Sequence, residues 1–344
     1  MMNNLATYFT SQGWKVILCN DFFQDNKTPQ YEVVPTVKHL YLAENNKGNT
    51  IIKNIIRIRK LRRLVRLEKP DCILSFLGRP NLRMLLATAG LNTKKIVSVC
   101  NDPYKEYGKG VRRIIARTLF RLANGCVFQT EDAKQYFPNC VQRKATIIFN
   151  PVDERFYQIS DFHKRQDIVT VGRLEEQKNH ALLIDAFCEI AHLFPEQKLI
   201  VYGDGSLLPE LQERVRDKSI DGRVVFAGNV KNIEKQLAKA KVFTLTSDYE
   251  GLPNALMEAM ASGVPCIATD CPCGGPRMLL KNGQSGFLVP CNNKEALAKA
   301  LSTVLSDDKL QRLFSLRAHD AAQCFKAETI YAQWEQYIQR VMEY

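Results

Sequence analysis

Two glutamates eight positions apart, Glu250 and Glu258, are the residues of this chain whose types and spacing point most directly to chemistry. They lie in the stretch YEGLPNALMEAM, residues 249–260, where the neighbours of Glu258 are apolar. A carboxylate accepts hydrogen bonds from paired sugar hydroxyls, so two carboxylates could bind a sugar and a ribose at once. The alternative is that Glu258 forms a buried ion pair with an arginine or a lysine.

The residues around the two glutamates predict a loop followed by a helix. Pro253 suits a first helical turn, and a glycine and a proline follow the apolar run. Glu250 is therefore expected in the loop after a strand at Val242–Leu245, and Glu258 inside the helix. Free backbone N–H groups at 251–255 would face an anion or a hydroxyl-bearing ligand between the two carboxylates.

Two cations follow a second predicted strand, in VTVGRLEEQKNH, residues 169–180. A strand, loop and helix in this order place Arg173 and Lys178 at the end of a sheet, where backbone N–H groups also point outward. Arginine can bind two phosphate oxygens at once, and lysine acts as a point charge. The alternative is that both are ordinary loop cations.

A glycine pair ends a third predicted strand, in VYGDGSLLPEL, residues 201–211. Gly203 and Gly205 flank one aspartate, and Ser206 can cap the helix that follows. A single Gly-x-Gly is weak support for a binding loop, and it gains weight only beside the other two segments.

Four segments together resemble the donor-binding half of glycosyltransferase family 4: VGRLEEQKNHALLIDAF, YGDGSLLPEL, FAGNV and SDYEGLPNALMEAMASGVPCIATD. They follow one another in unbroken order over roughly residues 165–290, and the spacing of Glu250 and Glu258 is their most specific element. The resemblance implies a retaining enzyme of the GT-B fold, in which two doubly wound, Rossmann-like α/β domains face a cleft.

The resemblance also implies roles for individual residues. Arg173 and Lys178 would bind the donor diphosphate and stabilise its charge as it leaves. Glu250 would contact the transferred sugar, and Glu258 would hold the ribose hydroxyls. Further donor-binding positions implied by the resemblance are Gly172, Gly203, Gly205, Asn229, Val230, Gly251, Leu252, Pro253 and Asn254.

The expected ligand is a UDP-sugar, with no metal and no other cofactor. The chain contains no Asp-x-Asp, so the metal clamp of another glycosyltransferase fold lacks its ligands. Charge on the leaving UDP would then be stabilised by Arg173, Lys178 and helix termini. TDCPCGGPRMLL, residues 269–280, is similar to members that build bacterial O-antigens, capsules, lipopolysaccharides and protein-linked glycans, which implies transfer of a hexose or N-acetylhexosamine to a lipid-diphosphate-linked acceptor.

The elements that must position these residues alternate between strands and helices, which predicts parallel sheets covered on both faces. At 344 residues, two domains of about 150 are expected. The predicted strands are Lys15–Cys19, Asp71–Phe76, Lys95–Val99, Cys126–Gln129 and Thr146–Phe149, then 168–171, 198–202, 223–227, 241–246, 265–269 and 286–289. The predicted helices of the first half are at about 2–12, 50–67, 80–89, 109–122 and 131–137.

These elements divide the chain into an acceptor-side domain at 1–150, a donor-binding domain at 151–327 and a last helix at 328–344 that packs back on the first domain. The chain opens in a helical pattern, so the first domain is expected to lack its opening strand and the glycine-rich loop after it. Many family members also carry a histidine where this chain has Cys100 or Asn101. Asn101 and Asp102 are retained as acceptor-side candidates.

Two other functions stay open at this point. A chain without the opening strand could be a truncated, non-catalytic glycosyltransferase-like binding protein. A UDP-sugar epimerase of similar fold is the third hypothesis, and the linked Glu250–Glu258 and Arg173–Lys178 segments count against it.

Charge is unevenly distributed along the chain. Residues 1–150 hold 25 Lys+Arg against 10 Asp+Glu, a net of +15, whereas the rest sums to −3. This asymmetry predicts an anionic partner for the first half. The helical pattern at 51–67 interleaves apolar and basic residues. It fits a packed helix with a solvated face, or an interfacial helix on anionic lipid, and nucleic acid is not expected.

The cellular compartment of the protein is predicted from features that the sequence does not contain. It has no run of about 18 uncharged apolar residues and no signal-peptide layout at its start. Its eleven cysteines are scattered without metal-like pairs, which is typical of a reduced cytosol. We therefore expect a cytoplasmic protein peripherally associated with the inner face of the cytoplasmic membrane.

Overall fold

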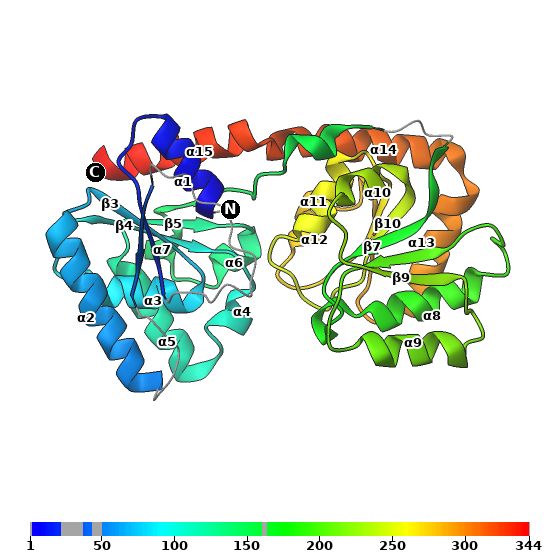
Figure 1. Ribbon diagram of the computed structural model, residues 1–344, viewed down its shortest axis with the longest axis horizontal. Coiled ribbons are helices and arrows are strands. Elements are labelled where there is room, and N and C mark those ends of the chain that lie inside the picture. The colour runs from blue at the N-terminus through cyan, green and yellow to red at the C-terminus, as the bar shows by residue number, and fades with distance from the viewer. Residues whose placement is uncertain (1, 22–36, 43–49, 160–163, 344) are drawn as a thin grey trace. The chain divides into compact units, whose positions relative to one another are not determined.

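The chain forms two units in the computed structural model, which describes residues 2–21, 37–42, 50–159 and 164–343 (Figure 1). The first unit comprises Met1–Ile148 together with Glu328–Tyr344, and the second comprises Phe149–Ala327. The chain thus changes unit two residues before the boundary expected at 150, and again between 327 and 328.

The first unit contains two separate parallel sheets among its described residues, where one doubly wound sheet was predicted. β1 (Ile17–Asn20) pairs with β2 (Lys38–Tyr41), a four-residue strand that the sequence analysis missed. The other sheet has the order β3-β4-β5-β6, and no described strand joins β1 to β3. Its strands are β3 (Cys72–Phe76), β4 (Lys94–Val99), β5 (Gly125–Phe128) and β6 (Ala145–Ile147).

Helix α1 precedes β1, and the other helices before residue 148 lie between these strands along the chain, as the alternating pattern predicted. They are α1 (Met2–Ser11), α2 (Thr50–Glu68), α3 (Gly78–Ala87), α4 (Pro103–Glu106), α5 (Gly110–Leu119), α6 (Glu131–Gln135) and α7 (Asn139–Gln142).

The long basic helix α2 leaves several of its apolar residues exposed. In the packed-helix alternative its apolar residues would face inward, but Ile52 and Leu67 are exposed and Arg57 is buried. Arg62 donates from Nη1 to the carbonyls of Ala87 (2.9 Å) and Ala89 (2.8 Å) at the end of α3. Helix ends leave carbonyls without intrahelical donors, and a cation of α2 supplies them here. Part of the basic face therefore serves packing.

The second unit is a six-stranded parallel sheet with the order β12-β11-β10-β7-β8-β9. Every strand predicted for this half is present, within two residues of its expected bounds. The strands are β7 (Gln166–Val171), β8 (Leu199–Tyr202), β9 (Val224–Gly228), β10 (Ala240–Leu245), β11 (Cys266–Thr269) and β12 (Phe287–Val289). The helices are α8 (His180–Ile190), α9 (Leu208–Asp217), α10 (Ile233–Lys239), α11 (Asn254–Ala261), α12 (Gly275–Leu279), α13 (Lys294–Ser306) and α14 (Asp308–Ala322).

Both faces of this sheet are buried. Successive strand residues point to opposite faces, so Ile168 joins the core under α8 and α13 whereas Val169 joins the core under α11 and α14. The strand order reverses between β7 and β10, because β7 has β8 on one side and β10 on the other. In an open parallel sheet, ligands bind outside the carboxyl ends of the strands at such a reversal.

The last helix, α15 (Ala327–Glu343), packs on the first unit. Trp334 is fully buried, with its ring centroid 5.6 Å from that of Phe76. Tyr337 donates from Oη to the Lys144 carbonyl (2.6 Å) and accepts from the Cys126 N–H (2.7 Å). The helix therefore ties β5 and β6 through a buried hydroxyl. No described helix is long and apolar enough to cross a membrane.

Tyr337→Phe is expected to lower the free energy of unfolding by about 1–2 kcal/mol, because buried backbone groups of β5 and β6 lose a hydrogen-bond partner. Chemical denaturation followed by circular dichroism measures the change. Tyr104→Phe is the control, since Tyr104 is exposed and its change should stay within about 0.5 kcal/mol. Equal stability of wild type and Tyr337→Phe would show that the hydroxyl does not stabilise the unit.

Candidate functional site

The loops that follow β7 and β10 carry the predicted charged residues, and they lie on either side of the strand-order reversal. Arg173 and Lys178 follow β7, and Glu250 follows β10. Glu250 lies in the loop before α11, and Glu258 lies inside α11, as the sequence predicted. The sheet topology thus brings together residues that are more than 70 positions apart.

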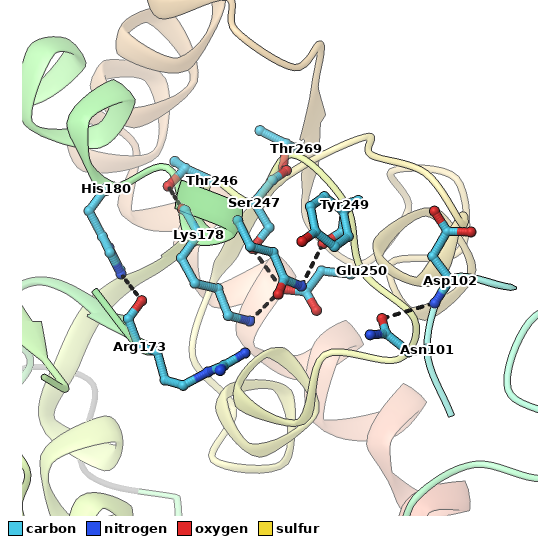
Figure 2. A network of polar contacts seen from close by, with 11 residues as sticks. Asn101, Asp102, Arg173, Lys178, His180, Thr246, Ser247, Tyr249, Glu250 and Thr269 are labelled. Atoms are coloured by element: carbon cyan, nitrogen blue, oxygen red, sulfur yellow. Dashed lines mark hydrogen bonds and ion pairs between the residues drawn. The ribbon is translucent and has the colours of Figure 1, made fainter. Parts of the chain in front are cut away.

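Glu250 is buried and forms an ion pair with Lys178 (Figure 2). The two side chains are only 8% and 16% exposed. Ser247 donates from Oγ to Oε1 of Glu250 at 2.7 Å, the same oxygen that Lys178 contacts. Because the carboxylate has both a cation and a hydroxyl as partners, the cost of burying its charge is offset and its orientation is fixed.

The backbone around Glu250 is held by the loop after β11. The Glu250 N–H donates to the Pro272 carbonyl at 2.6 Å, and the Cys273 N–H donates to the Glu250 carbonyl at 2.8 Å. A Cβ at Gly275 would lie 1.9 Å from the carbonyl oxygen of Gly251. The TDCPCGGPRMLL segment thus positions Glu250 and leaves no room for a side chain at its second glycine.

Asn179 joins the two loops. Its backbone is left-handed (φ 45°), and its side chain accepts from the Leu182 N–H (3.2 Å) at the start of α8. Asn179 Nδ2 also donates to Oδ1 of Asp248 at 2.9 Å. Thr246 donates from Oγ1 to the carbonyls of Lys178 and Asn179, both at 3.0 Å. These bonds hold Lys178 opposite Glu250.

Arg173 is exposed and has no ion pair or hydrogen bond from its guanidinium to any described residue, so it is available to a ligand. Gly203 supports the loop that carries it. Its backbone is left-handed (φ 131°), and a Cβ there would lie 1.9 Å from the Gly172 carbonyl oxygen. Gly205 is equally close-packed, since its Cβ would be 2.4 Å from the Leu174 carbonyl oxygen. The Gly-x-Gly is therefore required for loop packing.

His180 begins α8 and is buried beneath this loop. Its Nε2 lies 3.3 Å from the Arg173 carbonyl oxygen. Burial lowers the pKa of His180 to about 4, so the ring is neutral at pH 7.

Glu258 has no ion pair with any described residue, so the structure does not support the buried ion pair that was its alternative. Burial, with a smaller contribution from Asp153, raises the pKa of Glu258 to about 7. Glu258 is therefore a largely buried carboxyl on α11 among apolar neighbours, with no cation paired to it in the described part of the chain.

The other predicted positions occupy different places. Asn229 and Val230 are exposed just beyond β9, and Asn254 accepts from Nδ2 of Asn150 at 2.7 Å. Asn101 and Asp102 belong to the first unit, after β4. Asp102 is buried and caps α4 by accepting from the Tyr104 N–H at 2.8 Å, a structural role the sequence did not predict for it.

Sequence reasoning missed Ser247, Gln177 and the capping role of Asn179. Gln177 donates from Nε2 to the Tyr249 carbonyl at 2.9 Å, across the two loops. Asn179 carried a usable signal, because asparagine directly before a helical pattern is a common N-cap. Gln177 carried none, since its partner Tyr249 is distant in sequence. Ser247 lies only three positions before Glu250, but that spacing in a loop does not by itself indicate a contact. Among the residues that the structure covers, no group of three or more His, Cys, Asp or Glu is arranged to hold a metal.

Ser247→Ala is expected to lower kcat about tenfold, because Glu250 loses the hydroxyl that orients it and hydrogen bonds to charged groups contribute about 1.5–3 kcal/mol. Steady-state rates of the sugar transfer that the resemblance implies measure this. Ser262→Ala is the control, since Ser262 is also buried but bonds the Glu258 carbonyl within its own helix (3.0 Å). An unchanged kcat for Ser247→Ala would mean that Lys178 alone orients Glu250.

Two family models match the chain. "Glycosyl transferases group 1" matches residues 152–320, and "Glycosyltransferase Family 4" matches residues 1–156. The two matches overlap at residues 152–156, shortly after the change of unit between 148 and 149, and together cover most of the chain.

Two relatives from Campylobacter jejuni are each 30% identical to the chain. One is the N-acetylgalactosamine-N,N'-diacetylbacillosaminyl-diphospho-undecaprenol 4-alpha-N-acetylgalactosaminyltransferase, with 87% of this chain and 86% of the relative covered. The other is the GalNAc-alpha-(1->4)-GalNAc-alpha-(1->3)-diNAcBac-PP-undecaprenol alpha-1,4-N-acetyl-D-galactosaminyltransferase, with 82% and 78% covered.

Solved structures share the fold at low identity. Sucrose-phosphate synthase from Thermosynechococcus elongatus superposes with a TM-score of 0.85 at 18% identity, over 99% of this chain and 92% of that one. HepE from Anabaena, crystallised with UDP, superposes with a TM-score of 0.77 at 19% identity, over 89% and 87%. With the sheet topology, the family models and the 30% relatives taken together, the chain belongs to glycosyltransferase family 4 and is a glycosyltransferase of the GT-B fold.

Proposed function

We propose that this glycosyltransferase is a retaining enzyme that moves a hexose or an N-acetylhexosamine from a UDP-sugar to a lipid-diphosphate-linked glycan in bacterial surface polysaccharide synthesis. The observation that supports a UDP-sugar as the donor is the buried Lys178–Glu250 pair at the strand-order reversal of the second unit. The names of the two Campylobacter relatives support the acceptor class, because both specify a diphospho-undecaprenol-linked glycan.

In this proposal the donor diphosphate binds Arg173 and Lys178. The exposed Arg173 guanidinium matches two phosphate oxygens, and Lys178 supplies a second positive charge beside them. Glu250 holds Lys178 before the donor binds and then contacts the transferred sugar. Glu258 accepts the ribose hydroxyls, which replace the solvation that its carboxylate has lost on burial.

We propose that no metal ion takes part. The cations Arg173 and Lys178 and the N–H groups that precede α11 would stabilise the charge that develops on the leaving UDP. Transfer is therefore expected to keep its rate in excess EDTA. A rate that falls with EDTA and recovers with Mg²⁺ or Mn²⁺ would contradict this part of the proposal.

Peripheral contact with the inner face of the cytoplasmic membrane is also proposed, through the basic first half of the chain. Its net charge of +15 over residues 1–150 favours an anionic surface, and each nearby Lys or Arg is worth about 1 kcal/mol there. A lipid-linked acceptor would be presented at that surface.

UDP binding measured by isothermal titration tests the donor site. Wild type is expected to bind UDP, and Glu258→Ala to bind it at least about tenfold more weakly, because the hydrogen bonds to a charged acceptor are lost. Glu213→Ala, an exposed glutamate on α9, is the matched control and should bind as wild type does. A wild type that fails to bind UDP at millimolar concentration, with Glu258→Ala no different, rules out the proposed donor.

The transfer reaction is tested with a panel of UDP-sugars and undecaprenyl-diphosphate-linked acceptors, with products identified by mass. Addition of one hexose or N-acetylhexosamine is the expected result, and NMR of the product should show the anomeric configuration of the donor. Inversion at the anomeric carbon would exclude the retaining assignment while leaving the transferase intact. Conversion of a UDP-sugar without any acceptor would favour an epimerase.

A further inference from the structure

Helix α5 carries its apolar residues on the outside of the first unit. Val111, Ile114 and Ile115 are 72%, 64% and 50% exposed, at the i, i+3, i+4 spacing of one helix face. Ala116 and Phe120, on the opposite side, are fully buried. A helix that packed normally on a soluble domain would turn Val111, Ile114 and Ile115 inward.

On the inward side of α5, next to the buried Ala116, the chain carries an arginine, Arg113. The guanidinium of Arg113 lies 5.0 Å from the centre of the Tyr136 ring and 5.6 Å from that of Tyr104. These cation–π contacts fix the rotation of α5 about its axis, because Arg113 is held against the unit. The outward apolar face is therefore built into the packing. We call Val111, Ile114, Ile115 and the exposed Leu122 the α5 stripe.

Cations border the α5 stripe on both sides. At 100° per residue in α5, Arg112 projects on one side of it and Arg117 on the other, and Arg121 follows in the 3₁₀ turn Phe120–Leu122. None of these three forms an ion pair with a described residue, and no aspartate or glutamate occurs between residues 107 and 130. The face thus combines exposed apolar side chains with uncompensated positive charge.

We propose that the α5 stripe and its flanking arginines form the surface by which this protein docks on an anionic lipid bilayer. An apolar face that enters the acyl boundary, with cations level with the headgroups, is the layout of an in-plane interfacial helix. The proposal rests on the proposed function only for its purpose, since contact with a bilayer would bring the enzyme to a lipid-linked acceptor.

A second copy of the chain fits this face less well. Two α5 stripes packed against each other would bring Arg112, Arg117 and Arg121 of both copies together without an acidic partner on the helix. Like charges placed close together oppose association. An anionic bilayer offers both the apolar phase and the opposite charge.

The basic helix α2 is the other candidate from the sequence, and its face is different. It exposes Ile52, Ile55 and Ile56, but Arg57 is buried and Arg62 binds carbonyls at the end of α3. Part of its charge is thus used inside the unit. We assign the primary contact to α5 and include α2 in the test.

Vesicle co-sedimentation tests the assignment, with vesicles of phosphatidylcholine alone and with added phosphatidylglycerol. Wild type is expected to bind the anionic vesicles and to release them as salt rises. Ile114→Asp/Ile115→Asp should weaken binding at least about tenfold, because charge is placed where the acyl boundary lies. Leu316→Asp on α14, 62% exposed, is the matched control and should bind as wild type does.

Arg112→Ala/Arg117→Ala is a second variant, which keeps the apolar residues and should weaken binding to anionic vesicles about tenfold. All substituted side chains lie largely outside the core, and thermal unfolding checks that each variant is folded. Unchanged vesicle binding by both α5 variants would overturn the proposal, as would a wild type that binds no vesicle. So would loss of binding confined to Ile55→Asp/Ile56→Asp on α2. A wild-type dimer that the α5 aspartates convert to a monomer would assign the stripe to a second copy instead.

The proposed function is tested separately with the same protein variants. UDP affinity and transfer to a detergent-dispersed acceptor should be unchanged in the α5 variants, because the altered residues are outside the donor unit. If the α5 variants transfer sugar and bind vesicles as wild type does, only the assignment of α5 as the membrane contact is wrong. Vesicle binding that depends on α5, in a protein that transfers no sugar from UDP, defeats only the proposed donor chemistry.

Discussion

Replacing Lys178 by alanine is expected to lower kcat by about 10²–10³-fold, the usual effect of removing one preorganised group that stabilises developing charge. Lys178 is largely buried beside Glu250, so no solvent ion can take its place without reorganising the loop after β7. Initial rates at saturating donor and acceptor measure the effect. Lys294→Ala is the control, since Lys294 pairs with Glu189 at 2.6 Å on an exposed surface and its loss should leave kcat unchanged.

The same substitution should also destabilise the second unit, because it leaves the carboxylate of Glu250 buried without its cation. Breaking a buried pair costs about 3–5 kcal/mol in unfolding free energy. Lys178→Ala/Glu250→Gln should recover part of that loss, since the remaining side chain is neutral and Ser247 can still bond it. Losses that simply add in the double variant would mean that the two side chains do not interact.

The stability of the protein is expected to depend on the ionisation of Glu258. The pKa of this carboxyl is about 7 in the folded chain against an ordinary 4.5, because burial disfavours its charged form. Between those two pH values the folded chain holds the proton more tightly than the unfolded chain, so wild-type stability falls as pH rises through this window. Above about pH 7 the loss levels off, at about 3 kcal/mol.

Glu258→Gln removes this ionisation and should be more stable than wild type by up to about 3 kcal/mol at pH 8, with the two proteins nearly equal at pH 4. Urea denaturation at a series of pH values measures the difference. Glu295→Gln, an exposed glutamate on α13, is the control and should show no such trend. A Glu258→Gln curve parallel to wild type across pH 4–8 would contradict the shifted pKa.

Ligand binding should act on the same group in the opposite direction. Ribose hydroxyls that donate to the Glu258 carboxylate favour its charged form, so UDP binding would lower its pKa and release a proton. Calorimetry in two buffers of different ionisation enthalpy measures that release near pH 7. Equal binding heats in the two buffers would place the ribose elsewhere.

The sequence determined the elements of the second unit and the placement of its charged residues along them. The strands and helices there follow local patterns, and Pro253 with the run after it placed Glu250 in a loop and Glu258 in a helix. Such features depend on side-chain periodicity and on turn residues, which act within a few positions. The resemblance to family 4 supplied what periodicity cannot, namely the roles expected of Arg173 and Lys178.

Only the tertiary structure decided which of these residues meet. Lys178 and Glu250 are paired because β7 and β10 are neighbours in the sheet. The local propensities of the sequence do not determine the order of the strands. The same holds for the lack of a described cation beside Glu258, for the two sheets formed by the described strands of the first unit, and for the outward apolar face of α5. Each depends on packing between segments that are distant along the chain. There the burial and the ionisation of a side chain depend on the residues opposite it in space, and not on its neighbours in sequence.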